Sequence, residues 1–251
     1  MNAFSNKLKY LRNKCPLVYC ITNQVTINLV ANSLLALGAS PIMAHSEQEV
    51  GEITAAADAL YLNIGTITPE KLNVMMLALQ VAGKKNIPVV LDPVGAGASK
   101  LRQKACHEIL ASGLVRLIRG NASEILALAK MSDTSRGVDA VHSVAAARGG
   151  AEWLAGHYGL VVALTGETDL ATNGRETRQI SGGHALMTRI TGMGCALSAI
   201  LAAWLADEKD HLQGAVWGLN MVGQCGLRAG RRAQGPGTFV PCWLDELYLT
   251  N

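Results

Sequence analysis

The fold of this chain is constrained most by short, continuous apolar runs that alternate with longer helical stretches. Six of these runs are predicted strands, at 17–21, 41–44, 60–64, 87–91, 115–118 and 160–164. They are largely continuous apolar runs with no regular alternation, which is the pattern of strands covered on both faces. Helical patterns fall at 25–37, 49–57, 69–82, 99–110, 122–129 and 138–157. The alternation predicts an α/β fold with a mostly parallel central sheet and helices on both faces.

The last third of the chain departs from this alternation. Asn173-Gly174, flanked by short extended runs within 167–182, predicts a β-hairpin. Three further helices are predicted at 195–206, 211–232 and 241–249. No low-complexity linker divides the sequence and no internal repeat is present, so we expect one domain over residues 1–251.

A glycine loop precedes the predicted helix at 195–206. Gly192 and Gly194 flank one residue, and Cys195 follows directly. Glycines allow close approach of the backbone to a ligand, and a helix start offers free N–H groups that bind anions such as phosphate. A thiol at such a position is expected to have a lowered pKa, so Cys195 is a candidate base. The alternative is a tight turn followed by a cysteine that only fills space.

Polar residues at the strand ends point to the same chemistry. In an open α/β sheet, ligands bind outside the carboxyl ends of the strands. The residues predicted to end the strands there are Asn23, Met43, Asn63, Asp92, Arg119 and Thr165. This set of amides, a carboxylate, a cation and a hydroxyl suits a phosphate ligand with a divalent metal.

Two acidic residues allow two interpretations each. Asn121-Ala122-Ser123-Glu124 is a capping box, in which Glu124 serves only the helix start. The functional alternative places Glu124 on the waters of a Mg²⁺ held by ATP, and both can hold at one helix start. Asp92 before Pro93 is either an ordinary turn or a metal-shell group. Arg119 is less ambiguous, because arginine is rarely buried without an anionic partner.

Composition excludes several other classes of protein. The net charge of +3 comes without a dense basic cluster, and aromatic residues make up only 4%, so nucleic acid is not an expected partner. The longest apolar run, 196–206, is too short to cross a membrane, and the N-terminus lacks an apolar signal core. The six cysteines form no C-x-x-C pair, so we expect a reduced cytoplasmic protein. The nucleophile-elbow and phosphate-loop motifs are both absent.

Seven motifs in the right order resemble those of the hydroxyethylthiazole kinases, a family of the ribokinase-like superfamily. They lie at 21–23, 37–43, 91–95, 119–124, 165–167, 192–198 and 235–239. The cysteine that ends the glycine loop is the most diagnostic of them. The resemblance implies transfer of the ATP γ-phosphate to the hydroxyl group of hydroxyethylthiazole, a salvage step toward thiamine, with Mg²⁺ as cofactor and ATP as co-substrate.

The resemblance also implies roles at the nucleotide. Asn121 and Glu124 match the N-x-x-E element for Mg²⁺ and phosphate, and Asp92 resembles a second acidic group in the metal shell. Arg119 and Thr165, with Asn121, are expected to contact ATP.

At the acceptor side, Met43 and Gly192 resemble thiazole contacts, with Asn23 close by. The segment from Gly192 through Gly194 to Cys195 is expected to form the anion hole, and Cys195 stands where most superfamily members carry an aspartate base.

One position departs from the family, because Met193 stands where a threonine is usual. If only the backbone N–H at this position is used, the change matters little; if a hydroxyl contacts phosphate, turnover is lower. The resemblance implies a homotrimer with active sites between subunits, and the apolar, charge-poor segment 24–43 suits a covered surface.

Two rival functions remain. The first is another ribokinase-like enzyme, such as a pyrimidine or pyridoxal kinase or an ATP-dependent hydrate dehydratase; Cys195 argues against the dehydratase, which carries an aspartate there. The second is a ligand-binding regulator that kept the fold. The presence of Asp92, Glu124 and the glycine loop argues against the regulator.

Overall fold

A computed structural model describes residues 3–132 and 144–251. Within them, eight strands form one sheet in the order β2-β1-β3-β4-β5-β6-β7-β8. The strands are β1 (Leu17–Ile21), β2 (Ser40–Ile42), β3 (Ala59–Asn63), β4 (Val89–Asp92), β5 (Val115–Asn121), β6 (Val161–Thr165), β7 (Asp169–Thr172) and β8 (Thr177–Ile180). The first six are parallel, and β7 and β8 form an antiparallel hairpin at one edge. The predicted α/β class and the predicted hairpin are confirmed.

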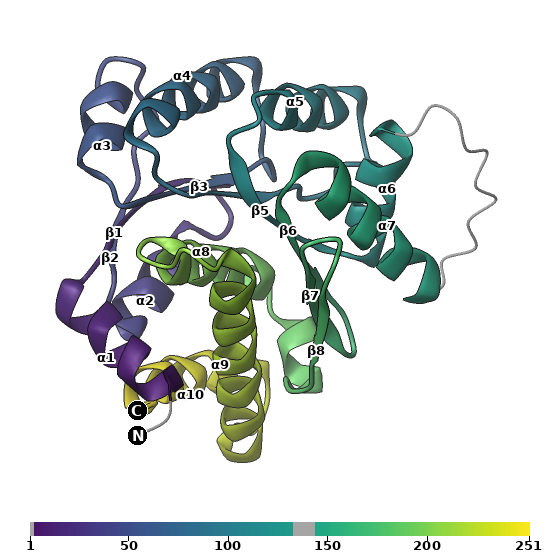
Figure 1. The fold of residues 1–251 in the computed structure, drawn as a ribbon. Coiled ribbons are helices and arrows are strands. Elements are labelled where there is room, and N and C mark those ends of the chain that lie inside the picture. The colour runs from purple at the N-terminus through teal and green to yellow at the C-terminus, as the bar shows by residue number, and fades with distance from the viewer. Residues whose placement is uncertain (1–2, 133–143) are drawn as a thin grey trace.

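Helices cover both faces of the sheet (Figure 1). One layer holds α3 (Val50–Ala56), α4 (Pro69–Lys85), α5 (Lys100–Ala111), α6 (Ala122–Ser132) and α7 (Val144–Tyr158). The other holds α1 (Ala3–Lys14), α2 (Ile27–Leu37), α8 (Met193–Leu205), α9 (His211–Arg232) and α10 (Pro236–Leu249). Each layer packs on its own hydrophobic core, so the central strands are buried from both sides.

Local sequence signals account for several helix ends. Gly38 ends α2 in the left-handed conformation, with φ of 100°, which a residue without a Cβ adopts at little cost. Thr68 begins α4 by accepting a hydrogen bond from the Lys71 N–H, and Pro69 takes the first helical position.

Some elements differ from the sequence predictions. Helix α1 was not predicted, because its sequence is polar and only Leu8 and Leu11 are buried. A short 3₁₀ helix, Ala185–Arg189, was also missed. Helix α10 begins at Pro236 after Gly235, so the predicted start at 241 is wrong; Pro241 lies within the helix. The predicted helix at 138–157 is described from residue 144 onward, and its first positions lie outside the described residues.

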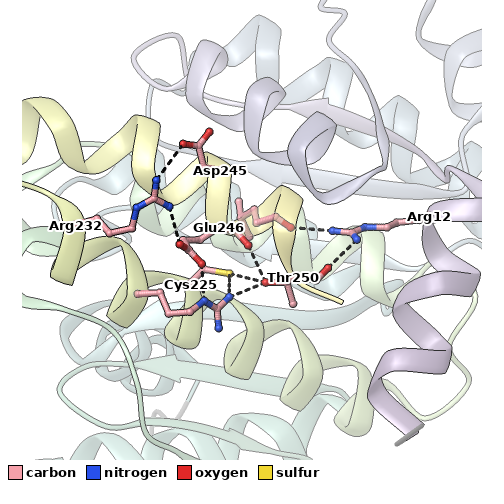
Figure 2. A network of polar contacts seen from close by, with 8 residues as sticks. Arg12, Cys225, Arg232, Asp245, Glu246 and Thr250 are labelled. Carbon is pink, nitrogen blue, oxygen red and sulfur yellow. Dashed lines mark hydrogen bonds and ion pairs between the residues drawn. The ribbon is translucent and has the colours of Figure 1, made fainter.

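A polar network holds the two ends of the chain together (Figure 2). The Arg12 guanidinium of α1 donates to the Leu37 carbonyl oxygen and to the carbonyl oxygen of Thr250. Arg228 and Arg232 of α9 donate to the two carboxylate oxygens of Glu246 at 2.6 and 2.9 Å. These bonds fix α1, α9 and α10 as one layer beneath the sheet.

The sheet topology contains a switch point next to β1. The chain passes from β1 outward to β2 and then back to β3 on the other side of β1, so the strand order reverses there. Loops at the carboxyl ends of strands on either side of such a reversal diverge and leave room for a ligand. In the described part of the chain, no helix is long and apolar enough to cross a membrane.

Candidate active site

The glycine loop leads directly into α8, as the sequence predicted. Gly192 is the N-cap residue, with φ of 95°, and a Cβ there would lie 2.8 Å from a methyl carbon of Thr26. The first intrahelical bond runs from the Ala196 N–H to the Gly192 carbonyl oxygen at 2.8 Å. The N–H groups of Met193, Gly194 and Cys195 therefore have no acceptor within the helix. Together with the helix dipole they form a donor set suited to an anion.

Arg119 lies against this helix start. It extends from the carboxyl-terminal half of β5, and its Nη2 atom donates to Thr165 Oγ1 at 2.6 Å. A Cβ added at Gly194 would overlap the guanidinium group, so only glycine permits this approach. Arg119 Nε is buried and has no hydrogen-bond partner among the described residues. The Arg119 guanidinium group therefore lies next to the free N–H groups at the start of α8.

A cavity of about 750 Å³ opens beside Arg119. Its lining includes four residues predicted for the site, namely Arg119, Asn121, Thr165 and Gly194. The hairpin and the loop after it supply the facing wall, which includes Asp169, Gly183 and His184. Val222 and Gly223 of α9 also line the cavity. Its size and mixed lining suit a nucleotide-sized ligand.

Cys195 lies outside the lining of this cavity, on a buried amide cluster. Its sulfur accepts hydrogen bonds from the Nδ2 atoms of Asn23 and Asn63, each at 3.3 Å. Burial raises the pKa of the Cys195 thiol, and the nearby Asp92 raises it further. The predicted lowering of this pKa is therefore wrong. The helix start and the two amides favour the thiolate, but desolvation of a side chain that is 9% exposed outweighs them.

Asp92 ends β4 and is fully buried. Its Oδ2 atom accepts hydrogen bonds from Ser198 Oγ at 2.9 Å, Asn63 Nδ2 at 3.1 Å and the Tyr61 hydroxyl at 3.3 Å. Burial raises its pKa to about 6 against the opposing effect of the Arg119 charge. The other oxygen, Oδ1, is buried and has no partner among the described residues. That oxygen remains able to accept from a bound ligand or water.

Glu124 forms the predicted capping box at the start of α6. The Glu124 N–H donates to Asn121 Oδ1 at 3.0 Å, and Glu124 Oε2 accepts from the Asn121 N–H at 2.9 Å. Its second oxygen accepts from the Gly95 N–H at 3.0 Å, which ties α6 to the loop after β4. The capping interpretation is confirmed; each carboxylate oxygen keeps a further lone pair for water.

Not all predicted site residues meet in one place. Met43 follows β2 and is half-buried against the core on the α8 side of the sheet. Met43, Asn23, Asp92, Glu124, Gly192 and Cys195 do not line the 750 Å³ cavity. The described residues hold no group of three or more histidine, cysteine or acidic side chains arranged to bind a metal. A divalent ion here would therefore need ligands from a substrate and from water.

The buried network beneath the glycine loop includes residues to which the sequence assigned no role. Asn63 was recognised only as a strand end, yet its amide touches both Asp92 and Cys195. Tyr61 precedes it by two positions and so lies on the same face of β3. Ser198 follows Cys195 by three positions, the spacing of one helix face. These spacings in the sequence indicate that the side chains share a face of β3 or of α8. The contacts join different elements, however, and only the structure shows them.

Comparison with known proteins gives a consistent result. Residues 8–251 match the hydroxyethylthiazole kinase family. A hydroxyethylthiazole kinase of Nitratidesulfovibrio vulgaris (strain DP4) is 47% identical over 95% of this chain and 89% of its own length. The structure of hydroxyethylthiazole kinase protein from Pyrococcus horikoshii OT3 superposes with a TM-score of 0.92 at 37% identity, covering 100% of this chain and 94% of that one. An ADP complex of Bacillus subtilis pyridoxal kinase shares the fold, with a TM-score of 0.63 at 17% identity. This match covers 83% of this chain and 90% of that chain.

Proposed function

Because this chain belongs to the hydroxyethylthiazole kinase family, we propose that it transfers the γ-phosphate of ATP to the hydroxyl group of hydroxyethylthiazole, giving the thiazole phosphate used for thiamine synthesis. The observation that carries the proposal is the Arg119 guanidinium held over Gly194, beside the free N–H groups of α8. Phosphoryl transfer depends mostly on positioning and on stabilisation of charge on the transferred group. Fixed donors at a helix start provide both.

ATP binds in the 750 Å³ cavity in this proposal. Arg119 contacts its phosphates, and Thr165 holds the guanidinium in place through the 2.6 Å hydrogen bond. Asn121 lines the same cavity at the start of α6 and contacts the nucleotide. The transferred phosphoryl group lies at the Met193, Gly194 and Cys195 N–H groups, which serve as the anion hole. Because Met193 has no side-chain hydroxyl group, the anion hole uses only the backbone N–H of this residue.

Mg²⁺ is held by Asp92 and Glu124 through water, together with the phosphates of ATP. The unpartnered Asp92 Oδ1 supports this assignment, since a buried carboxylate oxygen without a donor is costly unless a ligand supplies one. Glu124 Oε1 accepts a hydrogen bond from the Gly95 N–H and therefore lies beside the loop that follows Asp92. When bound, Mg²⁺ offsets the repulsion between phosphate groups.

Cys195 accepts the proton of the substrate alcohol as a general base. It occupies the first turn of α8, and two amide donors hold its sulfur. Its raised pKa keeps most of the thiol protonated near neutrality. This is compatible with phosphoryl transfer, in which the hydroxyl proton leaves late and a weak base suffices.

The thiazole is bound next to Cys195 by Met43, Gly192 and Asn23, in a site completed by a neighbouring subunit of a homotrimer. Val25, just before α2, and Leu35, within it, support an interface here, because they are 69% and 58% exposed. Exposed large apolar side chains are typical of surfaces that subunit contacts cover. Light scattering that found a fully active monomer would contradict this assembly.

We assign the chain to one kinase domain, because one sheet and the helices packed on it supply the proposed site residues. We place it in the cytoplasm, and the six free cysteines support a reducing compartment.

A coupled ADP-release assay with ATP and Mg²⁺ over a panel of alcohols tests this function. We expect hydroxyethylthiazole to give the highest kcat/KM, well above pyridoxal and hydroxymethylpyrimidine. Preference for either of those alcohols would assign the chain to another kinase of the same fold. Binding of these compounds without any ADP release would favour a ligand-binding regulator.

A further inference from the structure

A second cavity of about 410 Å³ lies at the opposite end of the sheet from the proposed active site. Its lining includes Arg116, at the amino-terminal end of β5, and Arg175, in the turn of the hairpin. Lys209, two residues before α9, and His211, its first residue, add further basic side chains to the lining. Residues with cationic side chains from three separate segments therefore line one open pocket.

The lining of this cavity carries more cationic than acidic side chains. Among the described residues, no ion pair involves Arg116, Arg175 or Lys209. The neighbouring acids are committed elsewhere, since Glu208 pairs with Lys7 at 3.0 Å and Glu176 with Arg178 at 2.6 Å. Three residues with cationic side chains and no ion-pair partner thus line one cavity, an arrangement that a bound anion would stabilise.

Among the described residues that line the cavity, Asp210 is the acidic one, and it caps a helix. Its Oδ1 atom accepts from the Gln213 N–H at 3.0 Å and so caps α9. Burial lowers the pKa of His211, and the charge of Arg116 lowers it further. A lowered pKa favours the neutral imidazole, which can donate one hydrogen bond to an anion.

The walls of the cavity are held in place by the fold. Gly174 packs so closely on α7 that an added Cβ would lie 2.7 Å from the backbone nitrogen of Gly156. Asn173 Oδ1 accepts from the Arg175 N–H at 3.0 Å, which fixes the turn that carries this arginine. Leu160 and Leu212, both buried, add an apolar floor. Basic side chains beside an apolar floor suit an anion with a small organic body.

The cavity is distinct from the proposed ATP site. Arg116 and Asn121 mark the two ends of β5, so the cavities lie roughly 16 Å apart along this strand at about 3.3 Å per residue. Among the described residues, none lines both. Both cavities nevertheless use β6, the β7–β8 hairpin and α9, at different positions along each element.

We propose that the 410 Å³ cavity is a second anion site, which binds the phosphate group of a small phosphorylated compound through Arg116, Arg175 and Lys209. This proposal is independent of the kinase reaction, because it involves none of the residues assigned to ATP, Mg²⁺ or the thiazole.

Calorimetric titration of the protein with inorganic phosphate tests the site, with a non-hydrolysable ATP analogue present to fill the first cavity. We expect one phosphate per chain. Arg116→Gln/Arg175→Gln should weaken binding about tenfold or more, because it removes two charge-assisted contacts. The matched control, Lys100→Gln/Lys104→Gln, removes two exposed charges from α5 and should leave the affinity within about twofold.

Two further measurements sharpen the result. Both double variants should keep the wild-type kcat in phosphate-free buffer, which separates this site from the active site. Tighter binding of phenyl phosphate than of inorganic phosphate would identify a phosphate ester as the ligand. Equal binding of the two compounds would identify free phosphate. Both outcomes support the site. Absence of saturable binding up to about 10 mM phosphate, or equal weakening by the two double variants, would overturn the proposal.

Discussion

The amide nitrogen of Asn63 lies 3.3 Å from the thiol sulfur of Cys195. The same nitrogen is 3.1 Å from Asp92 Oδ2, and the side-chain Oδ1 atom of Asn63 accepts from the Gly65 N–H at 2.9 Å. One buried amide therefore connects the proposed base, the proposed metal-shell carboxylate and the loop after β3. A fully buried side chain with these partners holds both groups in position.

Asn63→Ala should reduce turnover through this positioning. It leaves the buried Asp92, the Cys195 thiol and the Gly65 N–H each short of one partner, so the free energy of unfolding should fall by about 1–3 kcal/mol. We expect kcat to fall more than the KM for ATP rises, as measured in steady-state assays at 25 °C. Asn73→Ala, which removes an exposed amide from α4, is the control and should change neither. A wild-type kcat in a destabilised Asn63→Ala protein would limit Asn63 to a structural role.

Three Cys195 variants test the general base. Removal of a general base costs about 10² to 10⁴ in rate, and we expect Cys195→Ala near the lower end because the anion hole remains. The KM for ATP should change little. Cys195→Asp should keep substantial activity, since a carboxylate suits the same position. Cys195→Ser should resemble the alanine variant, because a hydroxyl is too weak a base.

The pH dependence of kcat separates these roles further. Since the thiol pKa is raised, the thiolate fraction of the wild type should still be increasing above about pH 8.5, the ordinary value for cysteine. We therefore expect kcat to rise through that range in the wild type and to stay level in Cys195→Asp. Equal rates for wild type and Cys195→Ala at every pH would leave Cys195 as a packing residue.

Glu124→Gln tests whether this residue does more than cap α6. Glutamine can accept only one of the two N–H bonds from Asn121 and Gly95, so we expect a loss of about 1–2 kcal/mol in unfolding free energy. At limiting Mg²⁺, turnover should also fall roughly tenfold or more. Thr68→Ala removes a comparable cap from α4 and is the control, with unchanged turnover. A near wild-type rate at limiting Mg²⁺ would return Glu124 to a purely structural role.

The Asp92→Asn variant should be more stable than the wild type near neutral pH, and its turnover should be lower. The folded-state pKa of about 6 lies above the ordinary 3.8, so folding favours the protonated carboxyl and the wild type loses stability as pH rises through 6. Two pKa units correspond to about 2–3 kcal/mol, so the variant should be the more stable protein by roughly this amount at pH 7.5 and not at pH 3.5. Its turnover with Mg²⁺ should fall sharply. Denaturant titrations at the two pH values check the stability, and a variant that is less stable at both would contradict the shift.

Much of the fold followed from sequence because its signals are local. The continuous apolar runs identified the six parallel strands, and Asn173-Gly174 identified the hairpin. Helix α1 gave no such signal, since it buries only two leucines and depends on Arg12 contacts to both α2 and α10. Proline at 241 suggested a helix start, whereas Pro236 is the residue that follows the N-cap.

The sequence predicted several of the residues that line the larger cavity, but it did not predict the contacts between site residues that lie far apart in the chain. Arg119, Asn121, Thr165 and Gly194 do line one cavity, as strand-end and helix-start positions indicated. The pKa of Cys195 was predicted in the wrong direction, because sequence shows the helix start and not the depth of burial. The bond from Gly95 to Glu124 joins residues 29 positions apart, and no local pattern reports it.

The most direct test of the central claim is mass-spectrometric detection of the product. The wild-type protein is incubated with hydroxyethylthiazole, ATP and Mg²⁺, and thiazole phosphate and ADP are quantified together. The account predicts equal amounts of both products, and loss of both in Arg119→Gln, while Arg116→Gln on the same strand keeps them. ADP formed without thiazole phosphate, or equal product from the two arginine variants, would contradict it.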